Sequence, residues 1–495
     1  MDLKDLHQLE TTLHAYRHAM GVLLYDGETA APRNSADGRG ETLALLSGVE
    51  HDLLTRPATR ALLAELTACQ DGLDAMERRR VELLKKESDD LANEPVEEYM
   101  AYQALLAKAQ AVWHDAKGRS DFAAFAPWLE KIVAYNRRFA GRKDPGKAPY
   151  DVLLDTYEEG ACMAQLDPFF RLLREELTPL ILEISARPQP DVSFLHRRYP
   201  IERQRLFSAR LMRMMDIDPD DCAIGETEHP FTDGYNIHDV RITTHYYEDD
   251  VASSMYSVIH EGGHALYELG SGAELEGTVL AGGSTMGIHE SQSRFYENII
   301  GRSPAFCQAI LPVMRELFPE NLQGVTEEML YRAVNRAEPS LIRTEADELT
   351  YGMHVMVRYE LEKGLIDGSL PVRDLPGEWN RLMKEALGVT VPDDRRGVLQ
   401  DSHWSGGSIG YFPSYALGSA YGAQMLEAMQ RDLDPFASVV RGDLKPVTAW
   451  LRERIHRHGR SLKPAQLLLN ATGAPFDPHR YTEYLKKKFS GIYGL

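Results

Sequence analysis

The sequence predicts a mainly α-helical protein that carries one small β-sheet. Apolar residues recur at helical spacing along most of the 495 residues, and segments with the alternation of a β-strand are scarce. The sequence has no internal repeat, no low-complexity tract and no long flexible linker. The length alone would suggest two or three domains or one large two-lobed unit. Because repeats and linkers are absent, we expect one integrated helical unit with the small sheet near the cleft.

The first half of the sequence is expected to form helix after helix. The predicted helices cover residues 3–20, 40–54, 60–67 and 73–116, with a break near Asn93-Glu94-Pro95. Basic residues at 78–80 and 85–86 alternate with acids around a narrow apolar stripe, which is typical of a solvated helix face. Residues 141–149 are rich in glycine and proline and predict a loop.

The second half contains the clearest strand signal. Residues 239–244 are β-branched and roughly alternating, which predicts a short strand. A helix is expected over residues 252–269, because apolar residues keep helical spacing there, no proline interrupts it, and Gly270 provides a C-cap signal. Further helices are predicted over residues 329–336, 346–363 and 414–432.

Charge and cysteine content narrow the class of protein. The formal net charge of −20 and the pI of about 5.3 oppose binding to nucleic acid or anionic membranes, because those partners are also negatively charged. The sequence has no signal-like N-terminal pattern and no apolar run of about 18 residues. The four cysteines lie far apart and form no CxxC pair. We therefore expect a soluble, cytoplasmic protein with reduced thiols.

The most informative motif is His260-Glu261-Gly262-Gly263-His264, inside the helix predicted over residues 252–269. Two histidines four residues apart project from one helix face and can hold one metal ion. Zinc with three protein ligands keeps a water as its fourth ligand, and the glutamate between the histidines is placed to take a proton from that water. About 0.09 such motifs are expected by chance. The alternative is a buried helix with two hydrogen-bonded histidines.

The glycines at positions 262 and 263 carry a second prediction. Each destabilises a helix by about 1 kcal/mol relative to alanine. This cost indicates that something must approach the helix backbone closely at the motif. The motif as a whole predicts a metal-dependent hydrolase.

A third metal ligand must come from another segment, and Glu290 is the candidate. It lies 26 residues after His264, which allows the first helix to end and a second helix to return antiparallel beside it. The alternative is that Glu290 only stabilises the N-terminus of its own helix. His289 is a rival ligand. Because adjacent helical residues point about 100° apart, His289 and Glu290 cannot both face the metal.

Six short blocks, taken together, resemble the M32 family of metallocarboxypeptidases, the thermostable carboxypeptidase Taq group. In family order they are HPF at 229–231, DxRxT at 239–243, HExxH at 260–264, HESQ at 289–292, IRxxAD at 342–347 and GxxQDxHW at 397–404. HExxH alone is weakly specific, whereas the ordered set is highly specific. A looser resemblance covers essentially the whole chain. One departure is Tyr25-Asp26-Gly27-Glu28-Thr29, where the family commonly has a WDQET-like segment.

The resemblance implies a two-lobed, predominantly helical molecule with a deep cleft, similar to neurolysin and angiotensin-converting enzyme and usually a homodimer. It implies one peptidase unit over residues 1–495, with an N-terminal helical arm or lid to about residue 150 and the catalytic region after it. It also implies one divalent metal per chain, zinc with cobalt as the alternative. The implied ligands are His260, His264 and Glu290, and Glu261 activates water.

Removal of a C-terminal residue requires a group that binds a free carboxylate, and the planar fork of arginine matches one bidentately. The resemblance assigns this role to Arg343. The alternative is a structural ion pair with Asp347, four residues further along an expected helix. Arg241 is a second candidate, although its place on the predicted strand between Asp239 and Thr243 fits a structural network better.

The transition state of peptide hydrolysis needs hydrogen-bond donors besides the metal. Similarity to other helical metallopeptidases indicates His403 with Tyr411 or Tyr415 for this role, and we favour Tyr415. The alternative is that both tyrosines are core aromatics with satisfied hydroxyls. His229 is expected either to line the cleft or to be structural.

Metal-bound histidines usually donate their second ring N–H to a carboxylate or a carbonyl. Arg294, one turn after Glu290, cannot accept such a bond. Glu297 lies seven residues after Glu290, near the same helix face, and is our hypothesis for this partner.

We therefore expect a metal-dependent carboxypeptidase that releases single residues from peptides with a free C-terminus. Broad specificity and poor action on terminal proline follow from the resemblance. The rival functions are an oligopeptidase or dipeptidyl carboxypeptidase on the same scaffold, and a non-catalytic helical binding protein.

Overall fold

Helices form most of the computed structural model, which describes residues 3–92 and 94–495, and the predicted fold class is confirmed. The first third of the chain contains α1 (Lys4–Thr29), α2 (Ala36–Thr55), α3 (Pro57–Ala68), α4 (Ala75–Ala92), α5 (Val96–Arg119), α6 (Phe122–Lys143) and α7 (Pro149–Tyr157). The centre contains α8 (Met163–Ser185), α9 (Ile201–Met214), α10 (Val251–Leu269), α11 (Met286–Arg294), α12 (Pro304–Leu317) and α13 (Glu327–Val334). The last third contains α14 (Glu348–Asp367), α15 (Leu375–Leu387), α16 (Pro413–Asp432), α17 (Pro435–Val439), α18 (Lys445–Arg454), α19 (Pro464–Thr472) and α20 (His479–Tyr493).

The predicted helices are present, and their ends differ for physical reasons. The predicted break at 93–95 includes residue 93, which lies outside the described residues; α4 ends before it and α5 begins after it. Helix α14 starts at Glu348 because the side chain of Asp347 accepts hydrogen bonds from the backbone N–H groups of Leu349 and Thr350. Arg343 therefore lies outside this helix, in a short 3₁₀ turn, and the alternative role of Arg343, a helical ion pair with Asp347, is wrong.

A three-stranded sheet lies against α10. Its strands are β1 (Cys222–Glu226), β2 (Thr232–Asn236) and β3 (Asp239–Thr244), in the order β1-β3-β2. Strand β3 pairs parallel to β1 and antiparallel to β2 and is the predicted strand. Strand β2 contains aspartate, glycine and asparagine, residues that disfavour strands, so it was not predicted. The sheet places the start of β2 beside the metal-motif helix.

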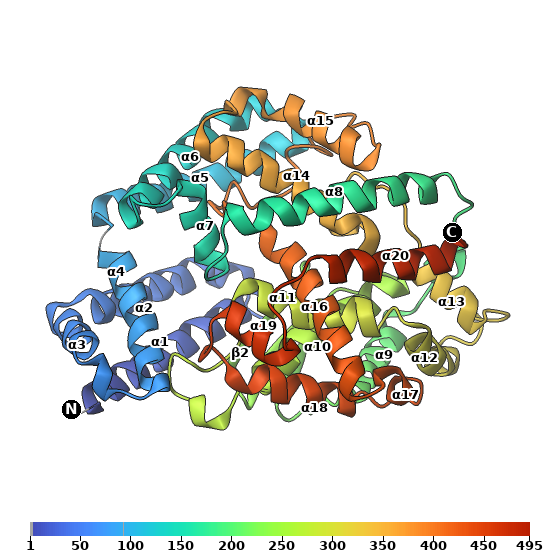
Figure 1. The fold of residues 1–495 in the computed structure, drawn as a ribbon, viewed down its shortest axis with the longest axis horizontal. Coiled ribbons are helices and arrows are strands. Elements are labelled where there is room, and N and C mark those ends of the chain that lie inside the picture. Colours follow the sequence, from blue (N-terminus) through green and yellow to red (C-terminus); the bar gives the residue numbers. More distant parts are fainter. Residues whose placement is uncertain (1–2, 93) are drawn as a thin grey trace.

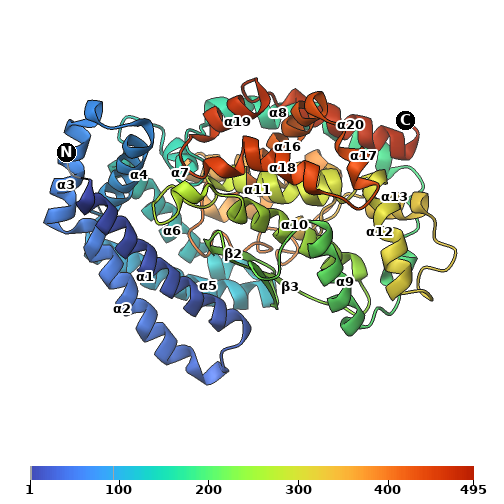
Figure 2. The same ribbon diagram turned by 90° about the horizontal axis from the view of Figure 1, so that it is seen from below.

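The described residues form two apolar cores. Helices α1–α4 are the part of the expected arm region that has its own core, and from here on the name N-terminal arm means these four helices. They bury a cluster of leucines that includes Leu9, Leu54 and Leu84. The main core begins in α5 and continues to α20. Figures 1 and 2 show the arm at one end of the molecule, beside the rest of the chain. Among the described residues, no helix combines the length and the apolar character needed to cross a lipid bilayer.

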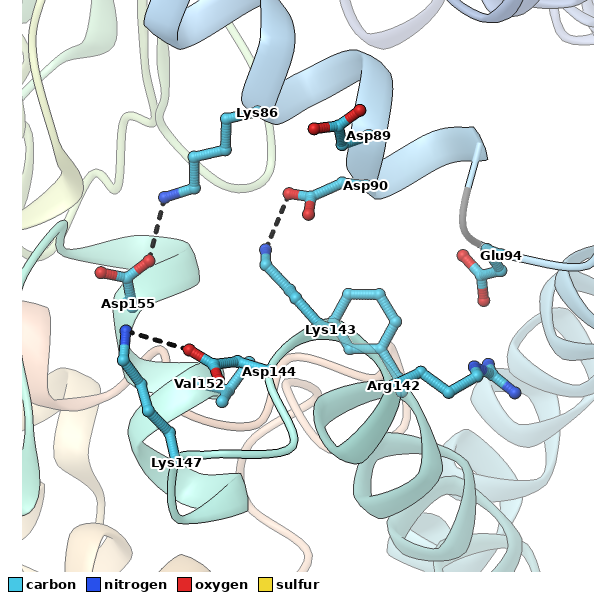
Figure 3. A pocket seen from close by; sticks show the side chains of 11 residues that line it. Lys86, Asp89, Asp90, Glu94, Arg142, Lys143, Asp144, Lys147, Val152 and Asp155 are labelled. Carbon is cyan, nitrogen blue, oxygen red and sulfur yellow. Dashed lines mark hydrogen bonds and ion pairs between the residues drawn. The ribbon is translucent and has the colours of Figure 1, made fainter.

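The arm meets the main body partly through ion pairs around a polar pocket (Figure 3). Lys86 of α4 lies 2.9 Å from Asp155 of α7, and Lys143 of α6 lies 2.7 Å from Asp90 of α4. These side chains are 15–37% exposed. Because such pairs contribute only about 0–1 kcal/mol each, this part of the junction is polar and weakly stabilised.

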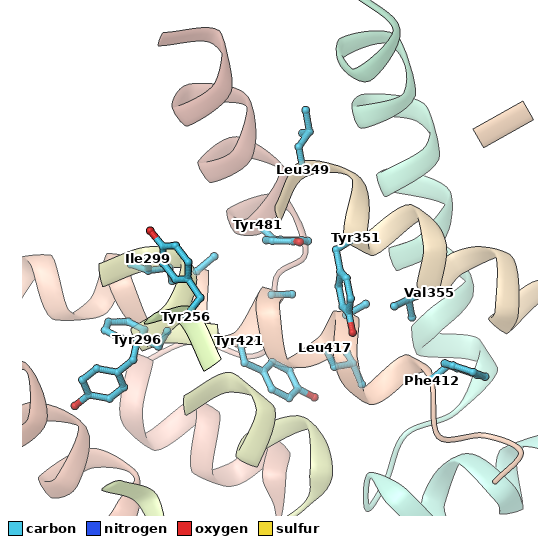
Figure 4. Close-up of a cluster of buried hydrophobic side chains, with 14 of the residues drawn as sticks. Tyr256, Tyr296, Ile299, Leu349, Tyr351, Val355, Phe412, Leu417, Tyr421 and Tyr481 are labelled. Atoms are coloured by element: carbon cyan, nitrogen blue, oxygen red, sulfur yellow. The ribbon is translucent and has the colours of Figure 1, made fainter. Parts of the chain in front are cut away.

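Helix α16 runs through the centre of the main core and positions α11. Most of its residues are buried, which is typical of a helix that is apolar on all sides. Figure 4 shows Leu417 and Tyr421 of α16 beside Tyr351 of α14. A Cβ atom added to Gly418 would lie 2.7 Å from Cβ of Glu290, so the glycine allows α11 to pack directly on α16.

Candidate metal centre

Helices α10 and α11 bring three side chains with metal-binding atoms together. Nε2 of His260 and Nε2 of His264 lie 3.8 and 3.6 Å from Oε2 of Glu290. Ligands of a tetrahedral zinc with bonds of about 2.0–2.1 Å stand about 3.3 Å apart, so the arrangement fits one such cation. In the described part of the chain, no other three His, Cys, Asp or Glu side chains converge within 4.8 Å.

The two motif glycines permit this approach. A Cβ atom added to Gly263 would lie 2.7 Å from Cα of Ser293 and 2.8 Å from the carbonyl oxygen of Gln292. One added to Gly262 would meet the end of the Met215 side chain. The expected close approach to the motif backbone is therefore confirmed, and the approaching segment is the helix that carries Glu290.

Glu290 is held as a carboxylate. Nε of Arg294 donates to its Oε1 at 2.8 Å, which leaves Oε2 facing the two histidines. Burial would raise the pKa of Glu290, but Arg294 and the histidines outweigh burial and hold this pKa well below its usual range. An ionised carboxylate is the state that binds a cation.

Glu261 is buried and held by the sheet. The hydroxyl of Thr232, at the start of β2, donates to Oε2 of Glu261 at 2.6 Å. Burial raises the pKa of Glu261. The glutamate lines the same cavity as His260 and Glu290, so its carboxylate can reach a water there.

His260 has a carboxylate partner behind it. Its Nδ1 lies 2.8 Å from Oε2 of Glu297, the residue hypothesised from the sequence. Glu297 belongs to a π-helical segment, Phe295–Ile300, that continues α11, and it also accepts from Arg294 and Arg302. Burial lowers the pKa of His260, but the carboxylates of Glu297 and Glu290 outweigh burial and raise this pKa to about 9.

His264 has a histidine behind it. Nδ1 of His264 lies 2.6 Å from Nδ1 of His289, and Nε2 of His289 lies 2.7 Å from Oε1 of Glu268. Both ring nitrogens of His289 are therefore directed at partners other than the point where His260, His264 and Glu290 converge. Burial lowers the pKa of His264 to about 4, which keeps the imidazole neutral.

Arg343, Arg358 and Asp401 form an ionic group that we call the arginine cluster. Nε and Nη2 of Arg343 donate to Oδ1 of Asp401 at 3.0 and 2.9 Å. Nε of Arg358 donates to Oδ2 of Asp401 at 2.8 Å. Arg343 lines the same cavity as His260 and Glu290. The guanidinium groups of Arg343 and Arg358 share one carboxylate, that of Asp401. The cluster therefore carries a net charge of about +1 beside the cavity.

His403 and Tyr415 lie in the same cavity, where Nε2 of His403 is 3.2 Å from the hydroxyl oxygen of Tyr415. Tyr411 does not line this cavity; its ring packs against Tyr157 and Tyr415, with centroid distances of 5.1 and 5.2 Å. Both phenols are close to His403, but Tyr415 is the one directed into the cavity.

A sequence model of the carboxypeptidase Taq (M32) metallopeptidase family matches residues 5–489. The chain belongs to the M32 family. Carboxypeptidase 1 of Bacillus subtilis is 38% identical over 494 residues, covering 99% of both chains. Thermostable carboxypeptidase 1 of Thermus thermophilus is 36% identical over 97% of both chains. The crystal structure of an M32 carboxypeptidase from Deinococcus radiodurans matches with a TM-score of 0.96 at 36% identity, covering 99% of both chains.

The resemblance drawn from the six blocks is thus confirmed, and the chain is an M32 metallocarboxypeptidase, a hydrolase. The family implies peptide substrates and a divalent metal. The convergence of two imidazoles and a carboxylate fits such a metal.

The other two predicted substrate-binding residues of this M32 carboxypeptidase are His229 and Arg241. His229 is exposed and lines the cavity. Arg241 does not line it; its Nε and Nη2 each donate to Asp239 at 2.8 Å, and its guanidinium lies between the rings of Tyr25 and Tyr235. The strand geometry turns Arg241 to the arm side of the sheet, so it belongs to the structural network that was its alternative.

The sequence did not point to several partners of the site residues in this M32 chain. Asp401 is part of the GxxQDxHW block, so the block itself was the available signal. Thr232 and Glu268 have no comparable signal, because their roles depend on how β2 and α10 pack. Arg358 lies among apolar residues of α14, so the sequence alone indicates a residue of a helix and no role at the site.

Proposed function

We propose that this chain is a zinc-dependent exopeptidase that releases single residues from the free C-terminus of peptides, with cobalt as the alternative metal. Broad side-chain specificity and poor action on terminal proline rest on the family resemblance. The observation that carries the proposal is that one cavity, of about 890 Å³, is lined by His260, Glu290 and the buried Arg343. Metal-dependent cleavage at a C-terminus needs a metal donor set and a carboxylate-binding group within reach of one substrate.

His260, His264 and Glu290 would hold the metal. Two imidazoles and a carboxylate suit zinc, and three protein ligands leave one coordination position open. A metal bound there supplies Lewis-acid chemistry, which polarises the scissile carbonyl and makes water more acidic. Arg294 supports this site by keeping Glu290 ionised.

Glu261 is the proposed general base and then general acid. Its carboxylate would accept a proton from the attacking water and deliver it to the leaving amine. Two features support this role: burial raises the pKa of Glu261, which favours proton uptake, and the hydroxyl of Thr232 fixes the carboxylate at 2.6 Å.

Arg343 is the proposed binding group for the terminal carboxylate. The net charge of about +1 of the arginine cluster matches the single negative charge of a peptide C-terminus. The pairing of Arg343 with Asp401 also restrains the guanidinium, so little side-chain freedom remains to be lost when substrate binds.

His403 and Tyr415 are the proposed donors to the oxygen that gains negative charge in the transition state. Tyr415 is favoured over Tyr411, because its hydroxyl lies beside His403 in the cavity. His229, at the exposed edge of the cavity, is proposed to contact the substrate.

We also propose that the enzyme is a cytoplasmic homodimer that acts on peptides and does not bind nucleic acid or membranes. The net charge of −20 and the four free thiols support this assignment. The homodimer rests on the family resemblance.

The test follows an N-blocked tripeptide by mass spectrometry, with either a free or an amidated C-terminus. Chelated enzyme should be inactive and should regain activity with zinc or cobalt. We expect loss of one residue from the free peptide and no cleavage of the amide.

Glu261→Gln should abolish turnover while metal still binds. Arg343→Ala should lose about 30-fold or more in kcat/KM on the free acid, since truncating one partner of a buried charge pair costs about 2–5 kcal/mol.

Arg343→Lys is the matched control for the last variant, because it keeps the charge and loses the bidentate fork. Release of dipeptides would replace the proposal with a dipeptidyl carboxypeptidase. Internal cleavage of the amidated peptide would indicate an oligopeptidase. Stoichiometric metal with no turnover of any peptide in a broad panel would indicate a binding protein.

A further inference from the structure

We propose that His289 and Glu268 are positioning residues that fix the imidazole of His264 with its Nε2 directed at the metal. This inference rests on the proposed metal site and deepens it. The three side chains form a continuous hydrogen-bonded row, with contacts of 2.6 Å between His264 and His289 and 2.7 Å between His289 and Glu268.

The elements of the fold determine the order of this row. His264 and Glu268 are one turn apart on the same face of α10. His289 lies on the neighbouring helix α11 and bridges them through its two ring nitrogens. His289, considered from the sequence as a rival metal ligand, thus links the proposed ligand His264 to the carboxylate of Glu268.

The metal geometry allows one placement of the hydrogens. Nε2 of His264 faces Glu290 at 3.6 Å, so it must be free of hydrogen to bind a cation, and Nδ1 carries the hydrogen. Nδ1 of His264 then donates to Nδ1 of His289. His289 in turn carries its hydrogen on Nε2 and donates it to Glu268. Each tautomer in the row follows from the one before it.

Packing prevents His289 from leaving the row. A Cβ atom added to Gly283 would stand 2.3 Å from Cδ2 of His289, so the loop before α11 lies directly against the imidazole. The backbone N–H of Gly283 also donates to Oε1 of Glu268 at 2.9 Å. The ring of Tyr267 lies 5.1 Å from the ring of His289.

The two metal-binding histidines are supported in different ways. His260 meets a carboxylate directly, because Glu297 lies 2.8 Å from its Nδ1 and two arginines offset that charge. His264 meets the imidazole of His289, and its carboxylate stands one residue further away. That carboxylate, Glu268, lines a second cavity of about 390 Å³ beside the arm. His264 therefore depends on His289 for orientation, and Glu268 acts on it only through His289.

The test measures the Kd of the metal-free protein for zinc alone, by competition with a coloured chelator. His289→Ala and His289→Gln should raise Kd by about 10- to 100-fold, the usual effect of losing a hydrogen-bond partner of a metal ligand. His289→Asn keeps an acceptor at the Nδ1 position and should stay within about threefold of the unmodified protein. Glu268→Gln should fall between these, because its amide oxygen still accepts from His289.

His238→Ala is the control, since this exposed histidine pairs with Asp221 away from the row. A Kd for His289→Ala within about twofold of the unmodified protein would overturn the inference while leaving the metal site intact. Failure of the unmodified protein to bind one zinc per chain would overturn the proposed function together with it.

A second measurement does not depend on the stability of the variants. Histidine-selective ¹⁵N spectra of the zinc-bound unmodified protein should show hydrogen on Nδ1 of His264 and on Nε2 of His289. The opposite tautomer of His289 would contradict the row. Similar Kd values for His289→Asn and His289→Gln would also contradict it, because the row requires the acceptor at one of the two ring positions.

Discussion

Arg343 and Asp401 form a buried ion pair in which Nη2 lies 2.9 Å from Oδ1 and the side chains are 7% and 11% exposed. The remaining oxygen of Asp401 binds Arg358, whose side chain is fully buried. A buried charge with a partner is tolerated, whereas an unpartnered one is strongly destabilising. Asp401 thus both stabilises two buried guanidinium groups and sets the position from which Arg343 faces the cavity.

Asp401→Asn should therefore change both substrate binding and stability. We expect KM for peptides with a free C-terminus to rise about 10- to 100-fold, since a hydrogen bond to a charged group contributes about 1.5–3 kcal/mol. We expect the free energy of unfolding to fall by about 3 kcal/mol or more, because two buried arginines lose their counter-charge. Steady-state kinetics and urea unfolding measure the two effects.

Asp393→Asn is the matched control in the same segment. Asp393 pairs with Arg396 at the surface, where ion pairs contribute about 0–1 kcal/mol. Equal effects of the two substitutions on KM would contradict the role assigned to the arginine cluster.

Thr232→Val should lower kcat by about 10-fold or more with little change in KM. The substitution keeps the shape of the side chain and removes the hydroxyl that donates to Glu261 at 2.6 Å. The carboxylate then loses the contact that orients it toward the reacting water. Thr232→Ser keeps the hydroxyl and should retain most of the activity. An active valine variant beside an active serine variant would show that this contact does not position Glu261.

Gly263→Ala should weaken metal binding. Its Cβ would stand 2.7 Å from Cα of Ser293, a backbone atom that moves only if α11 moves. Overpacking of this kind costs about 1–3 kcal/mol, and it displaces the helix that carries Glu290. We expect a lower thermal midpoint of the metal-free protein and a higher Kd for zinc.

Gly262→Ala separates packing from helix propensity. Its Cβ would meet Sδ and Cε of Met215, the flexible end of a side chain. Alanine also favours a helix over glycine by about 1 kcal/mol. This variant should keep its zinc affinity; a loss equal to that of Gly263→Ala would contradict the specific role of the α10–α11 contact.

Much of the fold was predictable because its signals are local. The periodic apolar pattern of α10 and its Gly270 terminus gave the helix almost to the residue. Strand β3 was found from its β-branched residues, whereas β2 forms a strand only because β3 lies beside it. Helix α14 began later than expected, because the capping by Asp347 depends on geometry that spacing alone does not show.

In the candidate site, too, local spacing predicted some pairs of residues and missed others. The pairing of His260 with His264 follows from helical periodicity, and Glu297 was reached from its seven-residue spacing to Glu290. Arg343 and Asp401 are 58 residues apart, and His264 and His289 belong to different helices. Partners of this kind depend on tertiary packing, so the only ion-pair partner that spacing offered for Arg343, as the alternative to substrate binding, was the nearer Asp347.

Glu158 should make the stability of the protein depend on pH. It is 3% exposed and accepts a hydrogen bond from the backbone N–H of Gly287, at the start of the helix that carries Glu290. Burial raises the pKa of Glu158 from 4.5 to about 7. The unfolded chain therefore ionises this group at a lower pH than the folded protein does. Its contribution to stability is fully present below pH 4.5 and is lost as the pH rises through 7.

Glu158→Gln should remove this dependence. The variant should gain up to about 3 kcal/mol relative to the unmodified protein between pH 4.5 and pH 8 in urea unfolding. The adjacent Glu159 is the control, because its pKa is shifted in the opposite direction. Burial opposes ionisation of Glu159, but Arg79 and Lys463 outweigh burial and lower its pKa. Glu159→Gln should therefore be less stable than the unmodified protein, with a deficit that grows as the pH rises to 4.5 and stays constant above it. Parallel curves for the two variants would contradict the assignment, because the same change of residue has opposite electrostatic consequences at the two positions.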